Sequence, residues 1–199
     1  IETLRNEAVF TVGLLALNVI TPDSTSTETS PFLFQFGLPP EDEANQVARQ
    51  AYSNGKRAVI IALGNSWGKR VVNAYTNTWK QLGGTILGTA WYGEESQTYP
   101  KAVKHALNID LSEARALALD RRLPIDIYVE PRRRADIDVI LLAGFSHNAR
   151  QILPQLRYFR ADDIPIYATS HVYDGDVNVE RDRDLNGLIF GTMPWLFNA

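Results

Sequence analysis

Residues 57–63 read RAVIIAL and are followed at 64–66 by the turn residues Gly-Asn-Ser. A short, nearly continuous apolar run bounded by turn residues is typical of a strand that is buried on both faces of a sheet. Residues 66–82 then place apolar side chains three and four positions apart, as on one face of a helix, and a Gly-Gly pair ends the pattern at 83–84. The stretch therefore predicts a strand, a tight turn and a helix in succession.

The same alternation continues outward along the chain. Pro154 is expected to kink the last of the predicted helices, and residues 110–113 resemble a capping box at the start of another. Buried strands that alternate with amphipathic helices predict an α/β fold with a parallel, doubly wound sheet. The further strands are expected near residues 85–91, 137–143, 164–168 and 185–193, and the further helices near 40–54, 99–107, 111–122 and 146–158.

The first 37 residues differ in composition from this alternating region. Two short apolar stretches, 12–20 and 32–36, predict strands, and the Ser/Thr-rich segment 21–31 between them predicts a flexible loop. Residues 1–5 lack the basic and then apolar pattern of a signal peptide. We therefore expect a fragment whose targeting sequence lies upstream.

Composition narrows the possible chemistry. The chain has 199 residues, a net charge of −3 and no cysteine. Disulfides, thiol catalysis and cysteine-based zinc sites are thereby excluded, and the charge gives no general attraction to nucleic acid or anionic membranes. His105, His147 and His171 show no metal-ligand spacing, so no metal and no cofactor are predicted.

Residues 64–68 match the G-x-S-x-G nucleophile elbow of α/β-hydrolases, with a strand before and a helix after. Ser66 would then be the nucleophile, and His147 or His171 the base. The alternative is that Asn65 or Ser66 caps the helix while Gly64 makes the turn. Because charged residues follow at once and no glycine-rich oxyanion segment precedes the motif, we favour the cap. We therefore predict no catalytic residue and no histidine within hydrogen-bond reach of Ser66.

Two other motifs are incomplete. Residues 64–69 resemble a phosphate-binding loop, but the spacing is one residue short and Arg70 stands where Ser or Thr would hold magnesium. Residues 174–178 begin like a calcium loop, but Val179 and Leu185 replace its glycine and glutamate. Neither nucleotide hydrolysis nor calcium binding is predicted.

Five arginines form the chain's one basic cluster in sequence. Such a cluster is either a solvated face or a docking surface for an acidic protein, and sparse aromatic residues argue against nucleic acid. We expect the cluster to be largely exposed and to contribute to partner docking. Its members are Arg121, Arg122, Arg132, Arg133 and Arg134.

Four predicted loops follow the carboxyl ends of strands, where parallel sheets bind ligands. The topology is expected to bring them together at one edge, either around a ligand or in a tight contact with a second lobe. The candidate residues of this cleft are Asn65, Ser66, Trp67, Tyr92, Phe145, Ser146, His147, Ser170, His171, Tyr173 and Asp174.

Two stretches resemble the second lobe of type I periplasmic binding proteins. The first runs from FGLPPEDEA at 36–44 to the Gly-Gly pair at 83–84, and the second from ADID at 135–138 to Trp195. The details QFGL at 35–38 and GTMPW at 191–195 resemble the LpoA family, outer-membrane lipoproteins that activate a bifunctional class A penicillin-binding protein. The family's lipid-bearing N-terminal cysteine and helical-repeat domain are not in this sequence.

The resemblance implies a domain division and a function. Residues 1–37 would be the end of a first lobe and the entry hinge, 38–186 the second lobe, and 187–199 the crossing back. The chain would be a non-enzymatic activator that binds a class A penicillin-binding protein and stimulates peptidoglycan cross-linking during cell wall biogenesis. It would lie in the periplasm, anchored to the outer membrane by a lipid outside this chain. The alternatives are a small-molecule receptor that uses the cleft between the lobes and, less favoured, the serine hydrolase.

Overall fold

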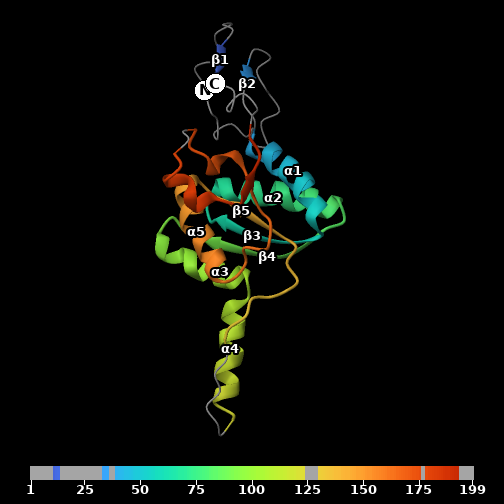
Figure 1. The fold of residues 1–199 in the computed structure, drawn as a ribbon. Coiled ribbons are helices and arrows are strands. Elements are labelled where there is room, and N and C mark those ends of the chain that lie inside the picture. The colour runs from blue at the N-terminus through green and yellow to red at the C-terminus, as the bar shows by residue number, and fades with distance from the viewer. Residues whose placement is uncertain (1–10, 14–32, 36–38, 124–129, 176–177, 193–199) are drawn as a thin grey trace.

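The computed structural model describes residues 11–13, 33–35, 39–123, 130–175 and 178–192. Near the N-terminus, β1 (Thr11–Gly13) and β2 (Leu33–Gln35) pair in parallel in a small sheet of their own. Figure 1 shows this pair apart from the main body. The predicted loop 21–31, the rest of the two predicted N-terminal strands and residues 193–199 lie outside the described residues. The proposed division at 37 and 186 thus stays a prediction.

The main body is built on a five-stranded sheet in the order β4-β3-β5-β6-β7, and every neighbouring pair of strands is parallel. This topology confirms the predicted parallel sheet. The β3 strand has the bounds that its apolar run predicts, whereas β5, β6 and β7 are each shorter than predicted. The bounds are β3 (Arg57–Leu63), β4 (Thr85–Tyr92), β5 (Val139–Ala143), β6 (Ile166–Ala168) and β7 (Leu188–Phe190).

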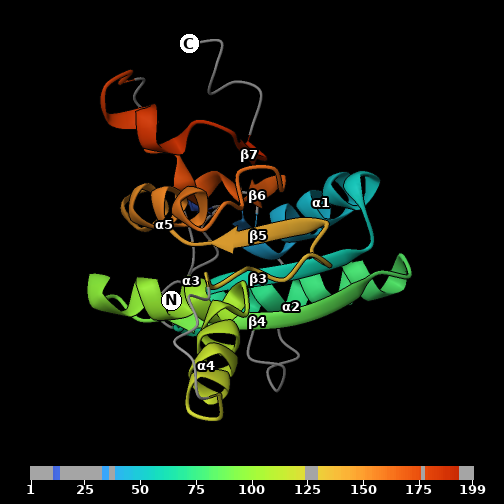
Figure 2. The same cartoon turned by 60° about the horizontal axis from the view of Figure 1, so that its bottom comes forward.

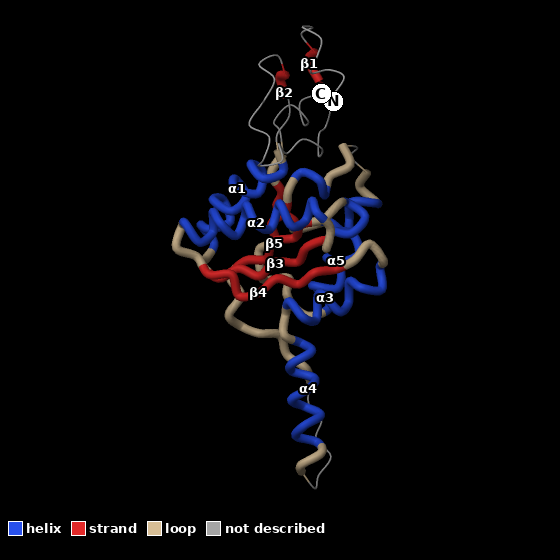
Figure 3. Tube along the Cα trace, turned by 180° about the vertical axis from the view of Figure 1, so that it is seen from behind, coloured by secondary structure: helices blue, strands red, loops and turns tan. Residues whose placement is uncertain are grey.

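Helices cover both faces of this sheet, because successive side chains of a strand point to opposite faces. In β3, Ile60 packs in the core that also contains residues of α1 (Pro40–Ala51) and α2 (Ser66–Gln81). Its neighbour Ile61 packs in the second core, with α3 (Tyr99–Ala106) and α5 (Ser146–Tyr158). Figure 3 shows the strands between the two pairs of helices. The α5 helix is continuous through Pro154.

The α4 helix (Ile109–Asp120) projects away from the sheet and its covering helices (Figures 1 and 2). Near its base, the Ser112 hydroxyl of α4 accepts a hydrogen bond from the Arg132 amide at 3.1 Å, and the Arg134 amide donates to the Leu107 carbonyl just before the helix at 3.0 Å. The predicted capping box is wrong. The helix starts at Ile109 after Asn108, whose left-handed φ of 56° supplies the turn, so Asp110 lies inside the first turn.

The turn after β3 shows what the G-x-S-x-G motif does here. The Asn65 side chain caps α2 by accepting a hydrogen bond from the Gly68 amide at 2.8 Å, which confirms the helix-cap interpretation. A Cβ at Gly68 would lie 2.0 Å from the Leu63 carbonyl oxygen. The second glycine therefore lets the start of the helix pass against the end of the strand.

Candidate functional site

The four predicted loops meet at the carboxyl edge of the sheet. The Gly64 amide donates to the Tyr92 carbonyl at 2.8 Å, which joins the first loop to the second. The Trp67 ring stacks on Phe145 with centroids 4.8 Å apart and lies 4.9 Å from the ring of His171, which brings in the third and fourth loops. The predicted convergence is confirmed.

Aromatic rings from three of the loops pack against one another at this edge, with Trp67 buried and His147 exposed. Trp67 is only 6% exposed. The His171 ring also meets Phe145, edge to face at 5.9 Å, and the His147 ring lies parallel to Phe145 at 6.4 Å. Ring stacking of this kind packs the loops against one another rather than leaving space between them. The four rings of Trp67, Phe145, His147 and His171 are called the edge cluster below.

A buried carboxylate from α1 supports the edge cluster. Glu43 is 4% exposed and accepts hydrogen bonds from the Ser170 amide at 3.1 Å and the Ser170 hydroxyl at 2.7 Å. Its other neighbour is the His171 ring, whose Nδ1 lies 3.7 Å from the carboxylate. Because a buried charge is stable only when it is paired or hydrogen-bonded, these contacts fix the fourth loop against α1.

Sequence reasoning missed Glu43, which it treated only as an acidic residue in the first turn of a helix. A signal was available. Glu43 precedes Val47 by four positions, so both lie on the buried face of α1. A carboxylate on a buried helix face requires a partner.

The hydrolase arrangement does not form in the described part of the chain. Ser66 is exposed at the first position of α2, and among the described residues no hydrogen bond joins its hydroxyl to a histidine. The two candidate bases have other partners. His147 Nε2 lies 3.0 Å from the Asn148 amide nitrogen, and His171 lies beside Glu43 and Thr169.

Two further cleft candidates, Tyr92 and Tyr173, make contacts that stabilise the fold. Tyr92 is 2% exposed and donates to the Ala143 carbonyl at 3.1 Å, and burial raises the pKa of its phenol far above the usual value. Tyr173 stacks on Phe190 of β7 at 5.7 Å. Both side chains thus hold strands and loops together.

The start of the supposed calcium loop is engaged by an arginine. Arg150 contacts Asp174 at 2.9 Å and Asp182 at 3.0 Å. Hydrogen bonds from Ser146 and then Arg150 lower the pKa of Asp174. Residues 176–177 lie outside the described residues, and the described ones contain no group of three or more ligands that could hold a metal ion.

A small groove of about 260 Å³ lies beside the edge, between α1 and the β6–β7 pair. Glu43 and Tyr167 line it, and the Tyr167 hydroxyl accepts a hydrogen bond from the Asn54 side chain at 2.9 Å. Sites for small molecules usually have a volume of about 300–1,000 Å³ and converging polar groups. This groove is smaller and holds none of the four edge-cluster rings.

The five arginines do not form one exposed cluster. Arg121, Arg122 and Arg132 are exposed, as predicted. Arg133 and Arg134 are only 20% exposed because each makes a two-pronged contact with a nearby carboxylate, Asp163 or Asp136. That part of the prediction is wrong.

The remaining arginines are also divided in space. The Arg132 amide donates to the Ser112 hydroxyl at the base of α4. Arg121 follows Ser112 by nine positions at the end of the helix, so it lies about 13 Å from Ser112 along the helix axis at 1.5 Å per residue. The positive charge therefore follows the length of α4 instead of forming a compact patch.

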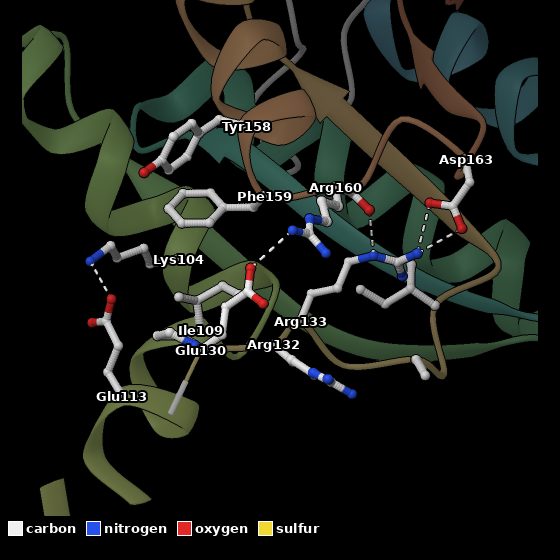
Figure 4. A pocket seen from close by; sticks show the side chains of 13 residues that line it. Lys104, Ile109, Glu113, Glu130, Arg132, Arg133, Tyr158, Phe159, Arg160 and Asp163 are labelled. Atoms are coloured by element: carbon white, nitrogen blue, oxygen red, sulfur yellow. Dashed lines mark hydrogen bonds and ion pairs between the residues drawn. The ribbon is translucent and has the colours of Figure 1, made fainter. Parts of the chain in front are cut away.

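A larger cavity, of about 1140 Å³, lies at the base of α4 (Figure 4). Ile109 and Phe159 give it apolar walls, and three ion pairs cross its lining. The pairs are Lys104–Glu113 at 2.7 Å, Arg160–Glu130 at 2.9 Å and Arg133–Asp163 at 2.6 Å. Arg132, which also lines the cavity, makes no ion pair among the described residues.

The doubly wound parallel sheet, with its loops gathered at one edge, defines a lobe of the type I periplasmic-binding-protein-like class. The C-terminal domain of LpoA from Haemophilus influenzae, described as a regulator of PBP1A, superimposes with a TM-score of 0.56 and 21% identity, covering 83% of this chain and 44% of that one. A substrate-binding periplasmic protein from Ralstonia solanacearum gives 0.56 and 17%, covering 80% and 38%. At these identities the likeness shows the fold alone.

The chain belongs to the LppC family, because the family model described as "LppC putative lipoprotein" matches residues 1–199. A curated relative from Vibrio vulnificus, named penicillin-binding protein activator LpoA, is 27% identical over 208 residues, which cover 100% of this chain and 33% of the relative. The predicted resemblance to the LpoA family is thereby confirmed. The chain spans about a third of the length of the curated relatives it matches. None of its described helices is long and apolar enough to span a membrane.

Proposed function

We propose that this chain is a non-enzymatic part of an envelope lipoprotein that binds a class A penicillin-binding protein and stimulates peptidoglycan cross-linking. The names of the relatives support an activator role, and the family description supports a lipoprotein. The protein would act in the periplasm, held to the outer membrane by a lipid on a segment outside this chain.

The observation that carries the proposal is the filled carboxyl edge. A solute receptor of this fold needs polar groups that converge on an open space at that edge. Here the loops are packed together by the rings of Trp67, Phe145 and His171, and the nearby carboxylate of Glu43 already accepts hydrogen bonds from Ser170. The arrangement suits a closed scaffold that acts through its outer surface.

The direct test combines binding with activity. The chain and, separately, the full-length protein would be titrated against a purified class A penicillin-binding protein by surface plasmon resonance. Cross-linking would be followed with a lipid-linked disaccharide-pentapeptide substrate. We expect saturable binding and an increased fraction of cross-linked product. A solute-binding lobe of the same fold serves as the matched control.

Two results would contradict the proposal. One is the absence of binding by both the chain and the full-length protein. The other is binding that leaves the cross-linked fraction unchanged, which would leave a partner but remove the stimulation.

A further inference from the structure

The α4 helix exposes an unusual amount of apolar surface. Leu111, Leu117 and Leu119 are 49%, 59% and 50% exposed. At 100° per residue these three side chains point in different directions around the helix. A helix that is apolar on all sides is normally buried. Of its residues only Ile109, at the base, is buried. The rest of α4 therefore has leucines on several sides, as a buried helix has, but these side chains are exposed.

Most of the charged side chains on and beside α4 that make no ion pair among the described residues are arginines. Asp110 and Glu113 are engaged by His105 and Lys104, at 3.1 Å and 2.7 Å. Among the described residues of this region, four arginines make no ion pair, and one acidic residue, Asp120, makes none either. The chain as a whole carries a net charge of −3, so the excess concerns only the unpaired charges of the described residues around α4. The four arginines are Arg115, Arg121, Arg122 and Arg132.

We propose that α4, together with Arg132 beside its base, forms the docking element of this chain, and that α4 binds in an apolar groove with a carboxylate-rich rim on a partner protein. The leucines supply apolar area, and the surrounding arginines match the acidic rim. This inference rests on the proposed function and deepens it, because it assigns the surface that meets the penicillin-binding protein.

The charge pattern also argues against a second copy of the chain as the occupant. Two α4 helices packed together would bring the same unpaired arginines close to one another, and like charges across an interface are unfavourable. An acidic partner surface avoids this repulsion, because its carboxylates attract the same arginines.

The test compares two paired variants with two matched controls. Leu117→Gln with Leu119→Gln removes apolar surface while keeping good helix formers, and Arg121→Glu with Arg122→Glu reverses the charge. The controls are Leu82→Gln just after α2 and Arg49→Glu on α1, both exposed and outside α4. Circular dichroism checks that all variants remain folded.

Binding of each variant to the penicillin-binding protein would be measured at three salt concentrations. We expect the leucine pair to weaken binding at least about tenfold, which corresponds to about 1.4 kcal/mol. The arginine pair should slow association and flatten its salt dependence. The controls should remain within about twofold of wild type.

The outcomes separate the inference from the function on which it rests. Wild-type binding with unchanged variants would overturn the inference and leave the proposed function intact, whereas no wild-type binding would overturn both. Hydrogen exchange of residues 109–120 adds a second readout, since these amides should become protected only in the complex. Protection in the full-length protein alone would mean that another segment of that protein covers α4. A dimer that the leucine pair abolishes would mean a second copy; either result overturns the inference.

Discussion

Gly68 and Ser66 belong to one five-residue motif, yet they have different roles. Ser66 is exposed at the first position of α2 and bonds to no histidine among the described residues. Gly68 is buried where α2 passes Leu63, and a methyl group there would overlap the Leu63 carbonyl oxygen. The motif therefore marks close packing between a strand and a helix, and a nucleophile is not needed to explain its glycines.

Substituting the two residues separately tests this interpretation. Gly68→Ala is expected to lower the free energy of unfolding by about 3 kcal/mol, because backbone atoms of β3 and α2 must separate. Ser66→Ala is expected to change it by less than about 0.5 kcal/mol, as at an ordinary exposed position. Urea denaturation followed by circular dichroism measures both. A larger loss at Ser66 than at Gly68 would contradict the assignment.

At this scale the sequence predicted some residues and not others. The Asn65 cap follows from local chemistry, because a side chain of the right type stands directly before a helix. The pairing of Arg133 with Asp163 could not be read locally, since the two residues lie on separate segments that only the fold brings together. The burial of Glu43 is partly predictable. Helical periodicity shows that it lies on the buried face of α1, but it does not show that Ser170 is its hydrogen-bond partner.

The starts of β3 and β5 are joined by a carboxylate. Asp138 accepts hydrogen bonds from the backbone amides of Lys56 and Arg57, each at 3.0 Å, and from the Arg57 guanidinium at 2.7 Å. The bond from the Arg57 side chain is the main reason why the pKa of Asp138 is lowered to about 2. Gly55 makes room for this carboxylate, since a Cβ there would lie 2.2 Å from the Asp138 Cβ. The contact therefore fixes the register of the two central strands.

Asp138→Asn should lower the free energy of unfolding by about 1 kcal/mol at pH 7, a value that allows for solvent screening of the partly exposed pair. The folded-state pKa is below the ordinary value of 3.8. The stabilisation is therefore present above about pH 4 and is lost as the pH falls toward 2, so the gap between the variant and wild type should narrow over that range. Denaturant titrations from pH 2 to 7 measure it. The exposed Asp162→Asn variant is the control, and a gap that widens in acid would refute the assignment.

The sequence predicted helices and strands correctly where the burial of a segment follows a simple pattern. The β3 and β5 strands are buried on both faces, so continuous apolar runs located them, and α2 has one buried face that its periodicity showed. The α4 helix was predicted as a helix near its observed bounds, but its projection was not. Its apolar residues follow no single face, and a helix that packs on a sheet needs one.

The whole molecule combines a familiar scaffold with an edge that is already filled. A substrate-binding periplasmic protein shares this fold, so the fold alone leaves function open. In this chain the edge holds the edge cluster, in which Trp67 contacts two other loops through its ring. The sequence predicted that these loops converge, because parallel topology requires it. It could not show that their side chains would fill the space, since that depends on rotamers and distances.

A solute screen tests the filled edge at the scale of the molecule. A receptor saturated at about a hundred times its dissociation constant gains about 2.7 kcal/mol, and a domain of this size would then melt about 5–10 °C higher. We expect no such shift with amino acids, sugars or peptides in differential scanning fluorimetry. A solute-binding protein with its own ligand is the positive control. A reproducible shift of several degrees would restore the receptor alternative.

The segment that contains α4 leaves the body of the fold near Leu107 and returns to it near Arg134. These two points are neighbours, because the Arg134 amide donates to the Leu107 carbonyl and the Arg132 amide to the Ser112 hydroxyl. Its length and sequence can therefore change during evolution while the sheet keeps its register. Loop-closure entropy rises only slowly with the number of inserted residues. Descendants of one scaffold can thus acquire new partners by exchanging this single segment, and a protein engineer can graft another recognition helix at the same two positions.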